Sequence, residues 1–162
     1  MSAPERTTHS AADTERLGEA LAPALVTGDL VALVGELGAG KTRFVTGMGR
    51  GLACRARVRS PSFAIVNEYH GRLLLLHLDL YRVETRDVDT LGLEEYRERG
   101  VVVVEWGDRL PAGHLADALV LTFVSHGGDT RWITATAGSG RGQELLGSWT
   151  RLETGASRGA GS

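Results

Sequence analysis

The order of apolar and polar positions along the chain predicts helices and strands that alternate. Leucines recur at four-residue spacing over 17–25, which is typical of the buried stripe of an amphipathic helix. The residues just before them, 10–13, resemble a capping box. The continuous apolar run 30–34 indicates a buried, parallel strand, and helical spacing of apolar residues then predicts a helix over 41–52.

The second half of the chain reads in the same way. Residues 63–69 and 72–80 are expected to form an antiparallel hairpin turning at His70-Gly71. Further along we expect a short helix within 87–96, strands at 101–105, 118–124 and 132–137, and a last helix near 143–152. Residues 1–9 and the Gly/Ala/Ser/Arg-rich tail 153–162 are predicted to be disordered, which leaves one folded domain over 10–152.

Composition narrows the class of protein. A length of 162 residues with 42% hydrophobic and 23% charged residues suits one globular domain. The N-terminus lacks a secretory signal and no apolar run approaches the ~20 residues of a membrane span, so we expect a cytoplasmic protein without membrane contact. A lone cysteine, Cys54, excludes an intrachain disulfide. The net charge of −2 argues against a stand-alone nucleic-acid clamp.

A phosphate-binding loop stands between the first predicted strand and the helix after it. Its residues are Gly35, Glu36, Leu37, Gly38, Ala39, Gly40, Lys41 and Thr42. Glycines in such a loop let backbone N–H groups turn towards phosphate oxygens at a helix N-terminus. Lys41, the only lysine among seventeen arginines, is expected to reach the β and γ phosphates, and the Thr42 hydroxyl to bind Mg²⁺. The sequence therefore predicts a nucleotide-binding protein, most simply an ATPase.

Two acids are candidates for the carboxylate that a P-loop protein needs beside Mg²⁺. Asp79 and Glu105 each end an aliphatic strand, where an unpaired charge would cost free energy of desolvation. Trp106 suits either the core or a contact to nucleotide or partner. His77, inside an apolar strand, is interpreted as a structural histidine.

A loop containing two serines precedes the predicted hairpin. Ser60 and Ser62 flank a proline there. They either satisfy backbone groups or belong to a loop that senses the γ-phosphate.

Three functional classes follow from these residues. A guanine-reading GTPase is excluded because its Asn-Lys-x-Asp motif would need a second lysine. An ATPase, a small-molecule kinase using Arg86, Arg97 and Arg99 in a lid, and a nucleotide-dependent binding module with negligible turnover all stay open.

The chain resembles the TsaE family of ATPases, which take part in threonylcarbamoyladenosine synthesis in bacterial tRNA. Five segments in order carry the resemblance, over about residues 13–137: 35–42, 60–63 with 66–69, 77–82 (His-Leu-Asp-Leu-Tyr-Arg), 91–96 and 104–106 (Val-Glu-Trp). The P-loop is widely shared, whereas Asp-Leu-Tyr-Arg and Glu-Trp at this spacing are far more specific. The chain has Ser62 where the family commonly has Thr, and Gly107 where it commonly has Pro.

The resemblance implies an α/β fold: a single P-loop NTPase domain with a mixed, largely parallel central sheet flanked by helices and carrying antiparallel hairpin strands. It implies ATP and Mg²⁺ as cofactors, with Thr42 and Glu105 as metal ligands and Asp79 assisting the metal or the attacking water. Ser60, Ser62 and Trp106 would serve in a switch or in partner contact. The implied partners are TsaD and TsaB, which would activate a weak ATPase, and tRNA would be met only through that complex.

Overall fold

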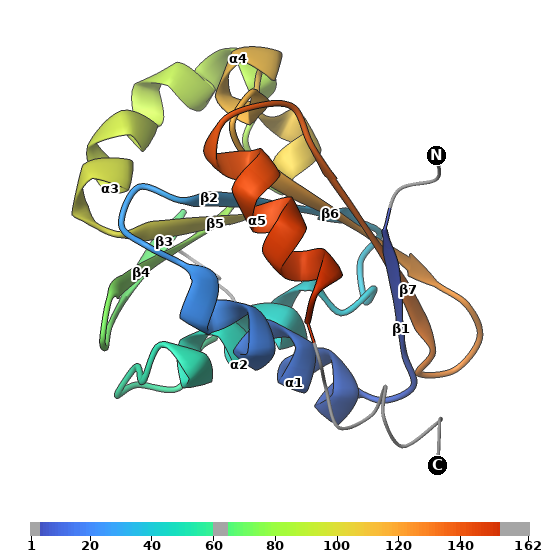
Figure 1. Ribbon diagram of the computed structural model, residues 1–162. Helices are drawn as coiled ribbons and strands as arrows, with labels where there is room; N and C mark the ends of the chain where they lie inside the picture. The colour runs from blue at the N-terminus through green and yellow to red at the C-terminus, as the bar shows by residue number, and fades with distance from the viewer. Residues whose placement is uncertain (1–3, 60–64, 153–162) are drawn as a thin grey trace.

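One seven-stranded sheet organises the molecule, with the strand order β1-β7-β6-β2-β5-β4-β3. The computed structural model describes residues 4–59 and 65–152. The four central strands, β6, β2, β5 and β4, are parallel, and antiparallel pairing adds β7 and β1 at one edge and β3 at the other. The sheet is therefore mixed, with a parallel centre, as the sequence predicted (Figure 1).

Strands and helices alternate along much of the chain, and the pairs β3–β4 and β6–β7 follow one another directly. The strands are β1 (Glu5–Thr8), β2 (Leu30–Gly35), β3 (Val66–His70), β4 (Leu74–Asp79), β5 (Val101–Glu105), β6 (Leu119–Ser125) and β7 (Arg131–Ala137). The α-helices are α1 (Ala11–Leu21), α2 (Lys41–Gly51), α3 (Leu93–Arg99), α4 (Ala112–Leu115) and α5 (Arg141–Thr150). Short 3-10 helices are η1 (Ala22–Ala24), η2 (Thr85–Leu91) and η3 (Gly107–Arg109).

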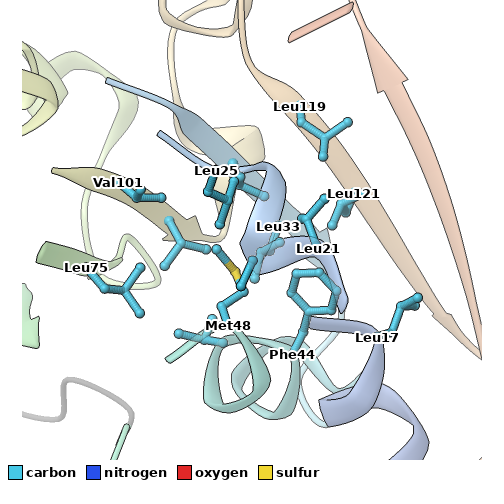
Figure 2. Packing of buried hydrophobic residues seen from close by; sticks show 14 of the residues in the cluster. Leu17, Leu21, Leu25, Leu33, Phe44, Met48, Leu75, Val101, Leu119 and Leu121 are labelled. Carbon is cyan, nitrogen blue, oxygen red and sulfur yellow. The ribbon is translucent and has the colours of Figure 1, made fainter. Parts of the chain in front are cut away.

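Helices cover both faces of the sheet, so there are two layers of core. One core gathers side chains of α1, α2 and α5 against one face, and Figure 2 shows Leu21, Phe44 and Met48 meeting there beside strand residues. The other core packs residues of η2, α3 and α4 against the opposite face. The central strand β5 is fully buried along its length because both faces are covered, which explains its unbroken run of valines.

Glycines set the closeness of α1 and α2. A Cβ at Gly47 of α2 would overlap the carbonyl oxygen of Glu15, and one at Gly18 of α1 would overlap that of Phe44. The two helices therefore touch through their backbones. The glycines of α2 lower its intrinsic helix propensity, but this packing requires them.

The predicted strands and helices appear among the described residues, and the structure adds β1, α4, η1 and η3. Residues 5–8, which the sequence predicted to be disordered, form β1 and pair with β7. The Arg6 guanidinium also donates to the carbonyl oxygens of Trp149 and Thr150 at the end of α5. These long-range contacts cannot be predicted from the polar sequence Glu-Arg-Thr-Thr. The start of the predicted hairpin strand and the tail 153–162 lie outside the described residues.

None of the helices within residues 4–59 and 65–152 is long and apolar enough to cross a membrane.

Candidate functional site

The predicted phosphate-binding loop lies where β2 leaves the sheet and α2 begins. Gly40 caps α2 with a φ of 102°, and Gly38 has a φ of 78°, both in the left-handed region that glycine tolerates. Gly35, at the end of β2, faces the backbone of β6, and a Cβ there would lie 2.7 Å from the carbonyl oxygen of Phe123. The loop glycines therefore serve both conformation and close packing, and the N-terminus of α2 points into the site.

Lys41 is held against the loop that it is expected to serve. Its ammonium donates to the carbonyl oxygens of Gly35 and Glu36, the latter at 3.0 Å. The residue is only 4% exposed. Burial lowers the pKa of Lys41 below its ordinary value of 10.5, while the carboxylates of Glu105 and Asp79 act in the opposite direction. The site thus holds a partly desolvated cation next to two acids.

The two predicted acids come together with the P-loop hydroxyl. Strands β4 and β5 are parallel neighbours, and their register places Asp79 opposite Glu105. The Thr42 hydroxyl lies 3.0 and 2.9 Å from the two carboxylate oxygens of Glu105. Asp79 lines the same cavity and its Oδ1 accepts from the backbone N–H of Tyr81 at 2.9 Å. A hydroxyl and two carboxylates therefore share one end of the cavity.

These oxygen donors fit Mg²⁺. The ion prefers hard oxygen ligands and is commonly held by one or two carboxylates, water and substrate phosphates. Within the described part of the chain, no three His, Cys, Asp or Glu side chains form a group that could hold a metal ion by themselves. An ion bound through Thr42 and Glu105 would thus depend on water and phosphate oxygens for its remaining ligands.

His77 contacts the metal-site candidate Glu105 directly. Its Nε2 lies 2.6 Å from Oε2 of Glu105, and the imidazole is completely buried. The sequence interpretation of a structural histidine did not identify this partner, because β4 and β5 are brought together only by sheet pairing.

Trp106 follows Glu105 in an unusual conformation. Its φ of 61° and ψ of 42° are left-handed, which is rare for a bulky residue and frequent at functional sites. The Lys41 ammonium lies 4.2 Å from the centre of a Trp106 ring, within cation–π range. The Tyr81 ring packs against the indole at 5.0 Å between centroids. Trp106 is half-buried and lines the cavity, so it contributes to the site as well as to packing.

The cavity around these residues has a volume of about 420 Å³. At the P-loop end it is lined by residues 37–43, Asp79, Tyr81, Glu105 and Trp106. The remaining lining comes from Ser10, Ala11, Thr14, Asp129 and Arg131, at the start of α1 and in the β6–β7 hairpin. Arg131 also donates to the carbonyl oxygen of Gly38 at 3.0 Å. Sequence reasoning missed this second group because no local motif marks it.

Other predicted site residues lie elsewhere. Ser60 and Ser62 fall outside the described residues, so their role stays a prediction. The arginines proposed for a kinase lid are paired with acids: Arg97 with Asp117, Arg99 with Glu68 and Arg86 with Glu84. The described lining of the cavity does not include these three arginines.

Comparison with known proteins identifies the family of the chain. Residues 8–133 match the model of the family described as threonylcarbamoyl adenosine biosynthesis protein TsaE. A TsaE protein of Bacillus subtilis is 38% identical over 135 residues, covering 82% of this chain and 85% of that protein. A TsaE protein of Streptomyces coelicolor is 40% identical, covering 74% and 87%. Two cyanobacterial relatives, from Synechocystis and Nostoc, are 46% and 45% identical, but the match spans only 66% and 64% of their length.

A solved structure agrees with these sequence matches. The crystal structure of Bacillus subtilis YdiB superposes with a TM-score of 0.73 at 33% identity, covering 91% of this chain and 94% of that one. Fold and sequence therefore agree, and the chain belongs to the TsaE family of tRNA threonylcarbamoyladenosine biosynthesis.

Proposed function

We propose that this protein binds ATP with Mg²⁺ in the P-loop cavity and hydrolyses it, and that in the cytoplasm this hydrolysis drives or resets a TsaD/TsaB transferase complex that modifies tRNA. The observation that carries the proposal is the hydrogen bonding of Thr42 to Glu105 beside a buried Lys41, at the N-terminus of α2. This arrangement combines the cation, hydroxyl and carboxylate that phosphoryl transfer from a nucleotide requires.

Each residue has a role in that proposal. The backbone of residues 35–41 and the ammonium of Lys41 would bind the β and γ phosphates. Thr42 and Glu105 would hold Mg²⁺, which when bound neutralises the charge on the phosphate oxygens. Asp79, next to Glu105 across the strand pair, would orient the attacking water or accept its proton.

The other end of the cavity is proposed to receive the nucleoside. Residues of α1 and the β6–β7 hairpin line it, and Arg131 joins this end to the loop by its hydrogen bond to Gly38. The cavity volume of about 420 Å³ lies within the range of small-molecule sites.

ATP binding and the fate of its γ-phosphate test the proposal. Isothermal titration should show Mg²⁺-dependent binding of ATP to the wild type and its loss in Lys41→Ala. Incubation with TsaD and TsaB should then release inorganic phosphate. Transfer of phosphate to a small acceptor without partners would reject hydrolysis in favour of a kinase. Nucleotide-dependent partner binding without phosphate release would reject it in favour of a binding module.

A further inference from the structure

One stretch of the chain contains basic residues but no acidic ones. Residues 37–67 contain six of its 18 lysines and arginines and none of its 20 acidic residues. Five of the six are Arg43, Arg50, Arg55, Arg57 and Arg59, here called the arginine face. The net charge of −2 therefore conceals a strongly uneven distribution of charge.

The arginine face borders two adjoining hollows. One, of about 410 Å³, is lined by Arg43, Arg57 and Arg59 with residues of α2. The other, of about 320 Å³, is lined by Arg50, Arg55 and Arg57 and also by the acidic residue Glu15. Arg57, Thr46 and Val58 line both. The first hollow also shares Thr42 and Arg43 with the nucleotide cavity, so a groove follows α2 away from the P-loop.

The backbone that carries these arginines is fixed. Val58 is buried and packs on Gly49 of α2. The Tyr69 hydroxyl accepts from the backbone N–H of Arg59 at 2.9 Å and lies 3.0 Å from its carbonyl oxygen. Arg57 and Arg59, on either side of Val58, consequently face solvent.

Only part of the positive charge is neutralised by nearby acids. Glu15 pairs with Arg43 at 3.1 Å and with Arg50 at 2.8 Å, and Glu19 with Arg50 at 3.4 Å. Among the described residues, no carboxylate lies within salt-bridge distance of Arg55, Arg57 or Arg59. Three exposed guanidinium groups are thus available to an anion, and a guanidinium suits the paired oxygens of a phosphate.

We propose that the arginine face is a direct binding site for the phosphodiester backbone of RNA, in contrast to the sequence-based expectation that tRNA is met only through the partner complex. The large apolar side chains exposed in the described residues are Val26, Leu37, Ile65, Tyr81 and Val124, and none of them lines either hollow. A face this charged and this poor in apolar anchors resembles a nucleic-acid interface more than a protein one. The choice of RNA rests on the proposed role in tRNA modification.

The test is fluorescence anisotropy with a labelled, unmodified tRNA transcript and the full chain. Arg55→Gln/Arg57→Gln/Arg59→Gln should weaken binding roughly tenfold or more near 0.1 M salt and lower the salt slope by about 2 to 3. Arg86→Gln/Arg99→Gln/Arg151→Gln removes the same charge elsewhere and should leave the affinity within about twofold. Equal effects of the two triple variants, or no binding by the wild type, would overturn the proposal.

Two further measurements distinguish an RNA site from a site for an acidic protein, and the arginine face from the ATP site. Polyglutamate of matched charge should displace little RNA, whereas equal displacement would reject an RNA site in favour of an acidic protein surface. Calorimetric ATP binding should persist in the Arg55/Arg57/Arg59 variant, because these residues do not line the nucleotide cavity. Loss of RNA binding with intact ATP binding supports the arginine face, while a failure of ATP binding by the wild type counts only against the proposed ATPase.

Discussion

The imidazole Nε2 of His77 lies 2.6 Å from Oε2 of Glu105, inside a sheet that leaves the imidazole no exposed surface. His77 Nδ1 has no hydrogen-bond partner among the described residues. The tautomer with its proton on Nε2 fits both facts, because it donates to the carboxylate and leaves a bare acceptor, not an unpaired N–H, in the apolar interior. His77 therefore orients the carboxylate that also meets Thr42.

Removing this orienting bond should weaken the binding of Mg²⁺ that accompanies nucleotide binding. We expect His77→Leu to raise the Mg²⁺ concentration needed for ATP binding roughly tenfold or more, the usual size of such effects. His77→Gln keeps a donor and should recover much of the loss. Calorimetric ATP titrations at varied Mg²⁺ measure this, and indistinguishable Mg²⁺ requirements of wild type and His77→Leu would show that the bond is only structural.

The two strand-end acids should separate binding from turnover. Asp79→Asn and Glu105→Gln preserve side-chain shape but remove the charge needed beside Mg²⁺ and water. At saturating Mg²⁺ both variants should still bind much of the ATP that the wild type binds, while phosphate release in the presence of partner proteins should fall roughly 100-fold or more. Calorimetry measures the ATP affinity, and a phosphate-release assay measures the rate of turnover. Either variant turning over at the wild-type rate would remove that residue from the site.

Lys41 should destabilise the nucleotide-free protein while enabling binding. Burial lowers its pKa, so the charged ammonium costs folding free energy at neutral pH. We expect Lys41→Met to melt at or above the wild-type temperature without nucleotide, and to lose the rise in melting temperature that ATP and Mg²⁺ give the wild type. A lower melting temperature of Lys41→Met at neutral pH would contradict this.

The same residue gives a pH dependence with a defined sign. Between the lowered folded-state pKa and the ordinary value of 10.5, the unfolded chain binds more protons at Lys41 than the folded one. Wild-type stability should therefore rise with pH across that window relative to Lys41→Met. Melting curves of the two proteins at increasing alkaline pH measure the difference in their melting temperatures. A wild type that loses stability relative to Lys41→Met as the pH rises would contradict the lowered pKa of Lys41.

The contact of α1 with α2 should tolerate no side chain at Gly47. Gly47→Ala forces a methyl group into the Glu15 carbonyl, and we expect a loss of about 1–3 kcal/mol of stability. Gly113→Ala, in α4 with open space around it, should be neutral or slightly stabilising. Urea unfolding compares the two, and equal midpoints would mean that the helices can separate without penalty.

Local patterns were sufficient to predict the central part of the fold. The apolar run before Gly35, the glycines of the loop and the helical spacing after Lys41 are all short-range signals, and β2, the loop and α2 appear where predicted. Asp79 and Glu105 were also recognisable, because a charge at the end of an aliphatic strand is visible in sequence. Their meeting is a consequence of parallel register.

The missed features depend on distant partners. β1 is polar and short, and it forms because it pairs with β7 and because the end of α5 accepts hydrogen bonds from Arg6. Arg131 reaches the P-loop from a strand about ninety residues later in the chain. His77 gained a functional meaning only when sheet pairing set it beside Glu105. Sequence periodicity contains no information about such contacts.

Steady-state ATP hydrolysis tests the central proposal most directly. It should be measured for this protein alone, then with TsaD and TsaB from the same organism, with Lys41→Ala as control. The account predicts a low rate that rises when the partners are added and disappears in the variant. A rate that does not respond to the partners, or that persists in Lys41→Ala, would contradict it.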